Sequence, residues 1–195
     1  MKEWDIRFND KLVHINGRQL KCEKIFMGND DIGTGGTAFN QKSGDFSKEM
    51  RSKLLWNAVG LSKWMILVTQ RDESNGREFV QTMNRVCGPM GINLGQPRVA
   101  VLHDERVGSY VDAIQRLQCN PCQMIVSIIP NHNKDRYDAI KKASYCETPM
   151  PSQVIVGRTI SKKQMLMSVC TKIAIQMASK LGGEPWALKI PVSFV

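Results

Sequence analysis

At 195 residues, with 42% hydrophobic and 23% charged residues, the chain is long enough for one well-packed domain and too short for two full ones. Its 27 Lys and Arg against 18 Asp and Glu give a net charge of +9, which favours polyanionic partners such as nucleic acid or an anionic membrane surface. No apolar run approaches the roughly 20 residues that span a bilayer, and residues 1–5 lack the apolar core of a signal peptide. We therefore expect a soluble intracellular protein.

The first 60 residues are expected to form a linker segment that packs on the rest of the chain. Short apolar patches alternate there with polar and glycine-rich stretches. Gly33, Gly35 and Gly36 have the composition of a phosphate loop, but no Gly-Lys-Ser/Thr follows and no long hydrophobic strand leads into them. A mobile loop is the better prediction for this stretch.

From Trp64 onward, four apolar runs rich in β-branched residues recur. They are Met65–Thr69, Val99–Leu102, Met124–Ile129 and Gln153–Val156. Near-continuous apolar runs of this length are typical of strands covered on both faces, as in a parallel sheet.

Helical patterns separate these runs. The apolar positions at helical spacing are Phe79, Met83, Val86 and Met90, then Val111, Ile114 and Leu117, then Tyr137, Ile140 and Ser144. Alternating strands and helices predict an α/β, Rossmann-like domain whose four-stranded, mainly parallel sheet carries helices on both faces.

Six cysteines do not require a disulfide framework in a chain of this length. Cys119-Asn120-Pro121-Cys122 has the spacing of a redox dithiol or half a zinc site. The scattered histidines His14, His103 and His132 supply no second ligand pair, and the motif precedes a strand where a redox motif would open a helix. We interpret Asn120-Pro121 as a turn.

The last helix is predicted over about residues 162–181. Ser161-Lys162-Lys163-Gln164 reads as a capping box, and Gly182-Gly183 supplies the stop. The predicted buried stripe consists of Leu166, Val169, Cys170, Ile173 and Met177. Gln176 and Lys180 fall at the edge of this stripe, where polar groups need partners.

Two polar pairs lie four residues apart in predicted helices: Tyr137 with Lys141, and Gln176 with Lys180. With Gln153 they offer an aromatic ring, two ammonium groups and two amides, which suit a terminal phosphorylated nucleotide if they converge. The alternative is that Tyr137 is a partly buried helix aromatic and the other four are ordinary surface residues. Residues 130–136 leave the third strand at its carboxyl end, where ligands bind in open α/β sheets, but Gln153 begins a strand, so its place at the same rim does not follow.

Several segments closely resemble the MID domain of Argonaute proteins, and the Piwi clade in particular. The central ones are Tyr137–Lys141, Gln153–Val156 and Thr171–Gly183; Asp45–Arg51, Leu61–Trp64 and Gly157–Thr159 also look like Piwi segments, and residues 18–28 look like the end of the linker before MID. The resemblance implies a linker over residues 1–60, a MID domain over 61–184 and the start of a PIWI domain over 185–195.

The resemblance assigns separate roles to the five residues. Tyr137 would stack on the first, unpaired base of a guide RNA, while Lys141, Gln153 and Lys180 would bind its 5′ phosphate. Gln176 stands where many eukaryotic Argonautes carry a lysine, and a glutamine there resembles members in which a divalent metal neutralises the phosphate. An amide oxygen can ligate Mg²⁺ and a lysine cannot. We expect this metal site to be incomplete, because the family's other ligand is the carboxyl terminus of the full protein.

Asn131, His132, Asn133, Lys134 and Asp135 match the position of the loop that reads the first base, whose backbone groups would favour a 5′ uridine. The alternative is an ordinary polar connection. No nucleophile or carboxylate constellation supports catalysis by His132, and the slicer carboxylates of the family lie in the PIWI domain, so we expect no enzyme activity.

The resemblance therefore implies a module that anchors Piwi-interacting RNA in germline transposon repression, in cytoplasmic germ granules or the nucleus, beside a PIWI domain and without a membrane. Two other interpretations stay open. One is an enzyme, either a nucleotide-using Rossmann-like protein or a Cys119/Cys122 oxidoreductase, and the other is a basic protein-interaction scaffold.

Overall fold

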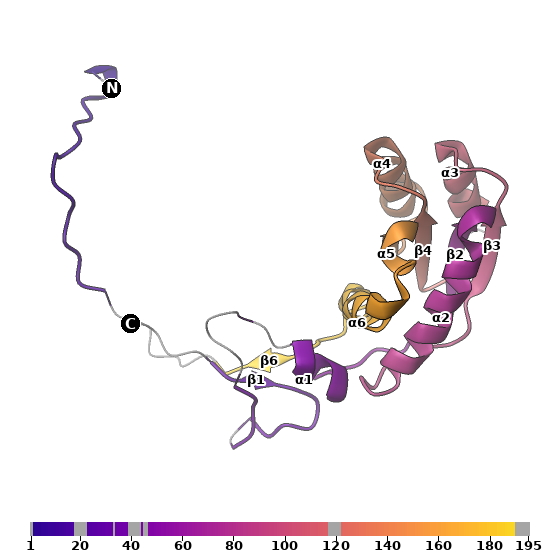
Figure 1. Ribbon diagram of the computed structural model, residues 1–195, viewed down its shortest axis with the longest axis horizontal. Coiled ribbons are helices and arrows are strands. Elements are labelled where there is room, and N and C mark those ends of the chain that lie inside the picture. The colour runs from indigo at the N-terminus through magenta and orange to yellow at the C-terminus, as the bar shows by residue number, and fades with distance from the viewer. Residues whose placement is uncertain are drawn as a thin grey trace.

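The computed structural model describes residues 2–17, 23–32, 34–38, 44, 47–116 and 122–189 (Figure 1). Its centre is a four-stranded sheet made of β2 (Trp64–Thr69), β3 (Arg98–Leu102), β4 (Met124–Ile129) and β5 (Ser152–Val156). The strand order is β3-β2-β4-β5, and all three neighbouring pairs are parallel. The predicted Rossmann-like sheet is confirmed, with each strand within one residue of its predicted start. All six residues of β4 are buried, as a central strand covered on both faces requires.

Helices cover both faces of this sheet. The buried core on one face joins alternate strand residues to α2 (Glu73–Cys87), α5 (Gly157–Ile160) and α6 (Lys163–Lys180). On the other face, α3 (Val107–Gln115) and α4 (Lys134–Lys142) lie side by side (Figure 1). The 3-10 turn η2 (Gln70–Asp72) follows β2, and the π-helical turn η4 (Ala143–Glu147) extends α4.

The predicted helices hold with corrections at their ends. Helix α2 ends at Cys87, so Met90 is buried in the following turn instead of in the helix. Ser144 falls in η4, where its buried hydroxyl donates to the Ile140 carbonyl at 2.6 Å. Leu117 lies outside the described residues.

The start of α6 corrects the predicted capping box. Lys162 is the N-cap and provides no side-chain cap, whereas the Ser161 hydroxyl donates to the Arg158 carbonyl at 3.1 Å. Ser161 therefore binds the end of the short helix α5, and the sequence pattern did not predict this helix. The predicted stop is confirmed: Gly182 has φ +88, and the Gly183 N–H donates to the Ala178 carbonyl at 2.9 Å.

The buried side of α6 is wider than the predicted stripe. Leu166, Cys170, Ile173 and Met177 are buried and Val169 is half-buried, as expected. Ala174, Ile175 and Ala178 are buried as well, because α6 packs against α2, α5 and the sheet together.

The predicted linker packs on the rest only in part. Strand β1 (Ile25–Phe26) pairs antiparallel with β6 (Ala187–Leu188), and the side chains of Ile25, Phe26 and Leu55 are buried. Helix α1 (Ser47–Ser52) lies between β1 and Leu55 in the sequence. The 3-10 turn η1 (Lys2–Trp4) and the residues up to 17 do not pack in this way, because residues 3–17 are all exposed.

The glycine-rich stretch forms a tight turn in its described part. The Gly35 N–H donates to the Asp31 carbonyl at 2.7 Å, and Gly36 adopts φ +93. Gly33, residues 18–22, residues 45 and 46, and residues 190–195 lie outside the described residues. The predicted boundaries after residues 60 and 184 stay predictions.

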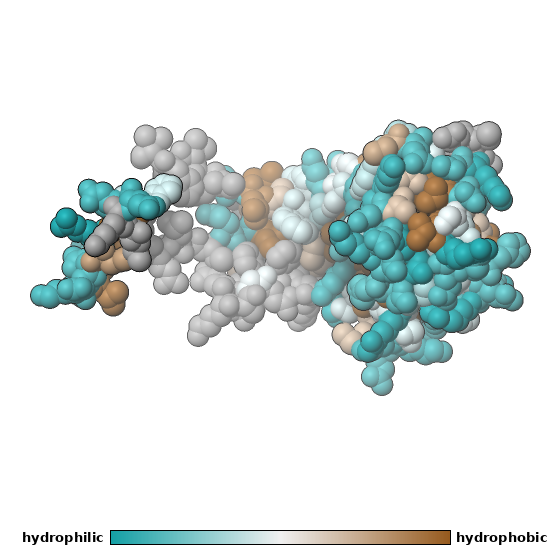
Figure 2. Space-filling view, turned by 90° about the horizontal axis from the view of Figure 1, so that it is seen from above, coloured by the Kyte–Doolittle hydropathy of each residue, from teal (hydrophilic) through white to brown (hydrophobic). Residues whose placement is uncertain are grey.

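Seen from above, the α/β part presents mainly hydrophilic residues, with a smaller apolar patch (Figure 2). Among the helices that the structure describes, none combines the length and the apolar character needed to cross a bilayer.

Candidate functional site

The candidate site lies at β5, the edge strand of the sheet, where α4 and α6 from opposite faces come together. Ser152 and Gln153 are the first two residues of β5. Helix α4 starts after the carboxyl end of β4 and leads back to the start of β5, so its last turn, with Lys141, lies near the amino end of β5. The last turn of α6, with Lys180, reaches the same end of β5.

The predicted site residues do not all lie at the carboxyl ends of the strands. Tyr137 and the loop before α4 border a hollow of about 480 Å³ with Ile129 and Val156, the last residues of β4 and β5. This part lies at the carboxyl ends of the strands, as predicted. Lys141 and Lys180 instead meet Gln153 at the amino end of β5, because both helices run back along the sheet.

Two ammonium groups converge on one backbone oxygen. Lys141 Nζ donates to the Ser152 carbonyl at 3.0 Å and to its hydroxyl at 2.8 Å. Lys180 Nζ donates to the same carbonyl at 2.9 Å and to Gln153 Oε1 at 2.6 Å. A neutral carbonyl oxygen thus faces two positive charges, an arrangement that would gain from an anionic acceptor.

Both lysines have pKa values below the usual lysine range. Burial lowers the pKa of Lys141. Burial also lowers the pKa of Lys180, and the neighbouring Lys141 charge lowers it further, while Tyr145 acts in the opposite direction. Removing an ammonium group from water disfavours its charged form, and at Lys180 the nearby Lys141 charge adds to this cost. A bound anion would remove this cost.

The two glutamines complete a polar chain. Gln153 is 8% exposed, and its Nε2 donates to Gln176 Oε1 at 3.2 Å. A lysine ammonium can only donate, so Gln153 must turn its oxygen to Lys180 and its nitrogen to Gln176. The chain Gln176, Gln153, Lys180 therefore has a fixed direction, and all five predicted residues belong to one connected region.

Tyr137 joins this region through Lys141. Tyr137 is 45% exposed, and Lys141 Nζ lies 5.7 Å from its ring centroid, as the spacing of four residues predicts. Sequence reasoning missed two neighbours. Ser152 supplies the shared acceptor, and the Tyr145 ring centroid lies 5.2 Å from Lys141 Nζ. Only the spacing of four residues between Lys141 and Tyr145 could have indicated the second.

Some residues of the predicted base-reading loop border the hollow, and others bind Arg136 at the start of α4. His132, Asn133 and Lys134 border the hollow beside Tyr137. Asn133 also caps α4, because its Oδ1 accepts from the Arg136 N–H at 2.8 Å. Asn131 Oδ1 accepts from the buried Arg136 guanidinium at 2.9 Å, and Asp135 is exposed in the first turn of α4. Arg136, which also donates to the Glu105 carbonyl at 3.1 Å, is a loop-shaping residue that sequence reasoning missed.

The described residues do not favour metal or dithiol chemistry. Cys119 lies outside them, and burial raises the pKa of the Cys122 thiol, which donates to the Met124 carbonyl at 3.3 Å. Within the described ranges, no three His, Cys, Asp or Glu side chains are placed to hold a metal ion. For Mg²⁺ at Gln176, they offer one amide oxygen, already accepting from Gln153, beside two ammonium groups. These residues alone do not fit a Mg²⁺ site.

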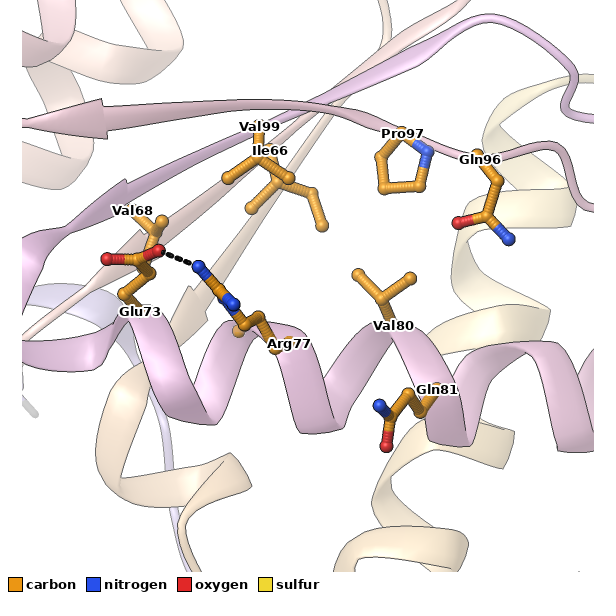
Figure 3. Close-up of a pocket in the computed structure, with 10 residues that line it drawn as sticks. Ile66, Val68, Glu73, Arg77, Val80, Gln81, Gln96, Pro97 and Val99 are labelled. Atoms are coloured by element: carbon orange, nitrogen blue, oxygen red, sulfur yellow. Dashed lines mark hydrogen bonds and ion pairs between the residues drawn. The ribbon is translucent and has the colours of Figure 1, made fainter.

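A separate hollow of about 250 Å³ lies between α2 and β3, the opposite edge strand (Figure 3). Its walls include Ile66, Val80 and Val99, and the carboxylate of Glu73 pairs with Arg77 at 2.6 Å along α2, on one side of the hollow. The pairing neutralises the charges there. This hollow shares no residue with the predicted phosphate site.

Comparisons with known proteins find similarity to Piwi and Argonaute proteins. A family model described as "Piwi domain" matches residues 124–195. The chain is 41% identical over 191 residues to Piwi-like protein 1 of Danio rerio, covering 97% of this chain and 21% of that protein. It is 32% identical over 191 residues to Protein argonaute-3 of Drosophila melanogaster, covering 98% of this chain and 21% of that protein. The chain thus spans about a fifth of the length of these curated relatives.

Solved structures show the same likeness. The crystal structure of Drosophila Piwi matches with a TM-score of 0.81 and 28% identity, over 98% of this chain and 26% of that one. The MID domain of Arabidopsis thaliana AGO5 matches with a TM-score of 0.55 and 20% identity, over 71% of this chain and 99% of that one, which supports the fold alone.

Proposed function

Because this chain belongs to the Piwi clade of Argonaute proteins and contains a MID-type domain, we propose that it anchors the phosphorylated 5′ end of a single-stranded guide RNA. One observation carries the proposal: Lys141 and Lys180, from helices on opposite faces, direct their ammonium groups at the Ser152 carbonyl. A phosphate bound beside Ser152 would replace a weak neutral acceptor by a dianion and make charge-assisted hydrogen bonds to both lysines.

The other residues would divide the terminal nucleotide between them. Gln153 would contribute its amide to the phosphate, and Tyr137 would stack on the first base in the hollow that the loop 131–135 borders. Backbone groups of this loop would match one base edge, which is the proposed origin of a 5′ uridine preference. Stacking and charge then act on different parts of the same nucleotide.

Mg²⁺ enters this proposal only as an auxiliary. In the full-length protein it would neutralise phosphate charge, with Gln176 as one ligand of a site that this chain does not complete. The residues of this chain supply positive charge through Lys141 and Lys180 already. We therefore expect phosphate binding by the chain to depend only weakly on Mg²⁺.

The role in the whole protein follows from its relatives by analogy. We propose a non-catalytic binding module that works beside a PIWI domain, with a Piwi-interacting RNA as guide, in germline transposon repression. Germ granules of the cytoplasm or the nucleus are the compartments in which we place it. No observation on the described residues favours the enzyme or scaffold interpretation over this one.

A titration tests the proposed function. Binding of a short RNA with a 5′ phosphate is compared with the same RNA carrying a 5′ hydroxyl, at one salt concentration, with and without a chelator. We expect the phosphate form to bind at least about tenfold more tightly, as one charge-assisted contact would give, and the chelator to change this ratio little. Equal affinity for both forms would leave only generic electrostatic binding and would refute the proposal.

The phosphate preference should also depend on pH. The charged lysines bind phosphate, and their pKa values lie below the usual 10.5, so the charged fraction falls earlier as pH rises. We expect the affinity for UMP to decline as pH rises, at a lower pH than the titration of an ordinary lysine would give. Calorimetric titrations of UMP and of uridine over this pH range isolate the phosphate-dependent part of the affinity, because the affinity for uridine should show no matching decline.

A further inference from the structure

Tyr145 stands in an unusual place beside the candidate phosphate site. It belongs to η4, the turn that extends α4, and it follows Lys141 by four residues as Lys141 follows Tyr137. Tyr145 is 56% exposed. Lys141 Nζ lies 5.2 Å from the Tyr145 ring centroid and 5.7 Å from that of Tyr137. The ammonium group is thus flanked by two aromatic rings on successive turns.

Tyr145 also borders the second lysine. With Ser152 and Lys180 it lines a hollow of about 350 Å³, whose wall is completed by Pro149, Met150 and Pro151. Three of its neighbours, Lys141, Ser152 and Lys180, are therefore the groups that form the convergent hydrogen bonds.

A flexible lysine gains from such a neighbour. Its four-carbon stem has many rotamers, and fixing the ammonium group before a ligand arrives reduces the ordering cost of binding. Tyr137 is expected to stack on the first base, and its ring is assigned to that role. Tyr145 lies one turn further along, next to Lys180 and away from the hollow that Tyr137 shares with the base-reading loop.

We propose that Tyr145 is a positioning residue of the 5′-phosphate site, whose aromatic ring holds the Lys141 ammonium group in place beside Ser152. The proposal rests on the proposed function. It deepens that function by adding a residue that acts on the phosphate through Lys141 and makes no contact with the base. The ring is the active part, so the hydroxyl is dispensable.

The test compares Tyr145→Leu, which removes the ring, with Tyr145→Phe, which keeps it. The measured quantity is the ratio of affinities for the 5′-phosphate and 5′-hydroxyl forms of one RNA. We expect Tyr145→Leu to lower this ratio about two- to fivefold, the range of an exposed cation–π contact, and Tyr145→Phe to keep it within about twofold. An unchanged ratio in Tyr145→Leu, or an equal fall in Tyr145→Phe, overturns the proposal. Urea unfolding of both variants controls for folding.

A second measurement needs no RNA. Proton titration of the Lys141 side chain, followed by NMR on carbon-labelled lysine, reports the ring contact directly in the ligand-free protein. We expect a lower Lys141 pKa in Tyr145→Leu than in the parent and in Tyr145→Phe, because the ring stabilises the ammonium form. A Lys141 titration that is the same in all three proteins contradicts the inference.

The two proposals fail in different ways. If the parent prefers the 5′ phosphate and Tyr145→Leu does so equally, the inference about Tyr145 is wrong and the proposed function stands. If the parent shows no preference, the proposed function is wrong and the role of Tyr145 falls with it, even where the Lys141 titration detects the ring contact.

Discussion

A Lys141→Glu substitution is expected to abolish the preference for a 5′ phosphate. The change replaces a charge-assisted contact by repulsion and places a carboxylate near Lys180, which can pair with it and close the site. Loss of one charged hydrogen bond costs about 1.5 to 3 kcal/mol, and the added repulsion increases this figure. We expect the affinity for 5′-phosphorylated RNA to fall at least about a hundredfold, measured by fluorescence anisotropy at fixed salt.

Lys142→Glu is the matched control for this substitution. Lys142 is the next residue, lies in the same helical turn and is exposed, and its substitution changes the net charge by the same amount. It should weaken both RNA forms slightly and alike, through long-range electrostatics. If Lys142→Glu and Lys141→Glu weaken the phosphate form equally, binding depends on net charge and the geometry around Ser152 is irrelevant.

The sheet could be predicted from the sequence because β-strands buried on both faces leave a continuous apolar run. Met124–Ile129 shows this most clearly, since the whole run is buried and paired on both sides. The end of α6 was predictable for a local reason as well, because Gly182 adopts the positive φ that favours glycine. The start of α6 was not predictable in this way. Ser161 is a residue type that often caps helices, but its hydroxyl donates to the Arg158 carbonyl at the end of α5.

The candidate site was predictable only as far as helical spacing reaches. A separation of four residues fixes the pairs Tyr137 with Lys141 and Gln176 with Lys180 on their helix faces. Their meeting with Gln153 depends on α4 and α6 running back on opposite faces and ending at the same edge strand, which is a tertiary property. The shared acceptor is a backbone carbonyl, and no residue type at position 152 announces it.

Tyr145 was hidden by the end of its helix. Helix α4 ends at Lys142, and beyond a helix end a spacing of four residues no longer fixes which side chains face each other. The π-helical turn carries the chain on, so Tyr145 still faces Lys141. Arg136 was missed for another reason. A charged residue is expected to be exposed, whereas the Arg136 side chain is buried and binds Asn131 and the Glu105 carbonyl.

A Tyr137→Ala substitution should weaken binding of 5′-phosphate and 5′-hydroxyl RNA to a similar extent, by about 1 to 3 kcal/mol. The ring is almost half exposed at the border of a hollow, so its removal should change the free energy of unfolding little. An RNA that carries a 5′ phosphate but lacks the first base provides the decisive comparison. If Tyr137 acts by stacking, the parent and Tyr137→Ala should bind this abasic RNA almost equally. If the variant is weakened as much with the abasic RNA as with the complete one, Tyr137 acts through the ammonium group of Lys141 and another surface holds the base.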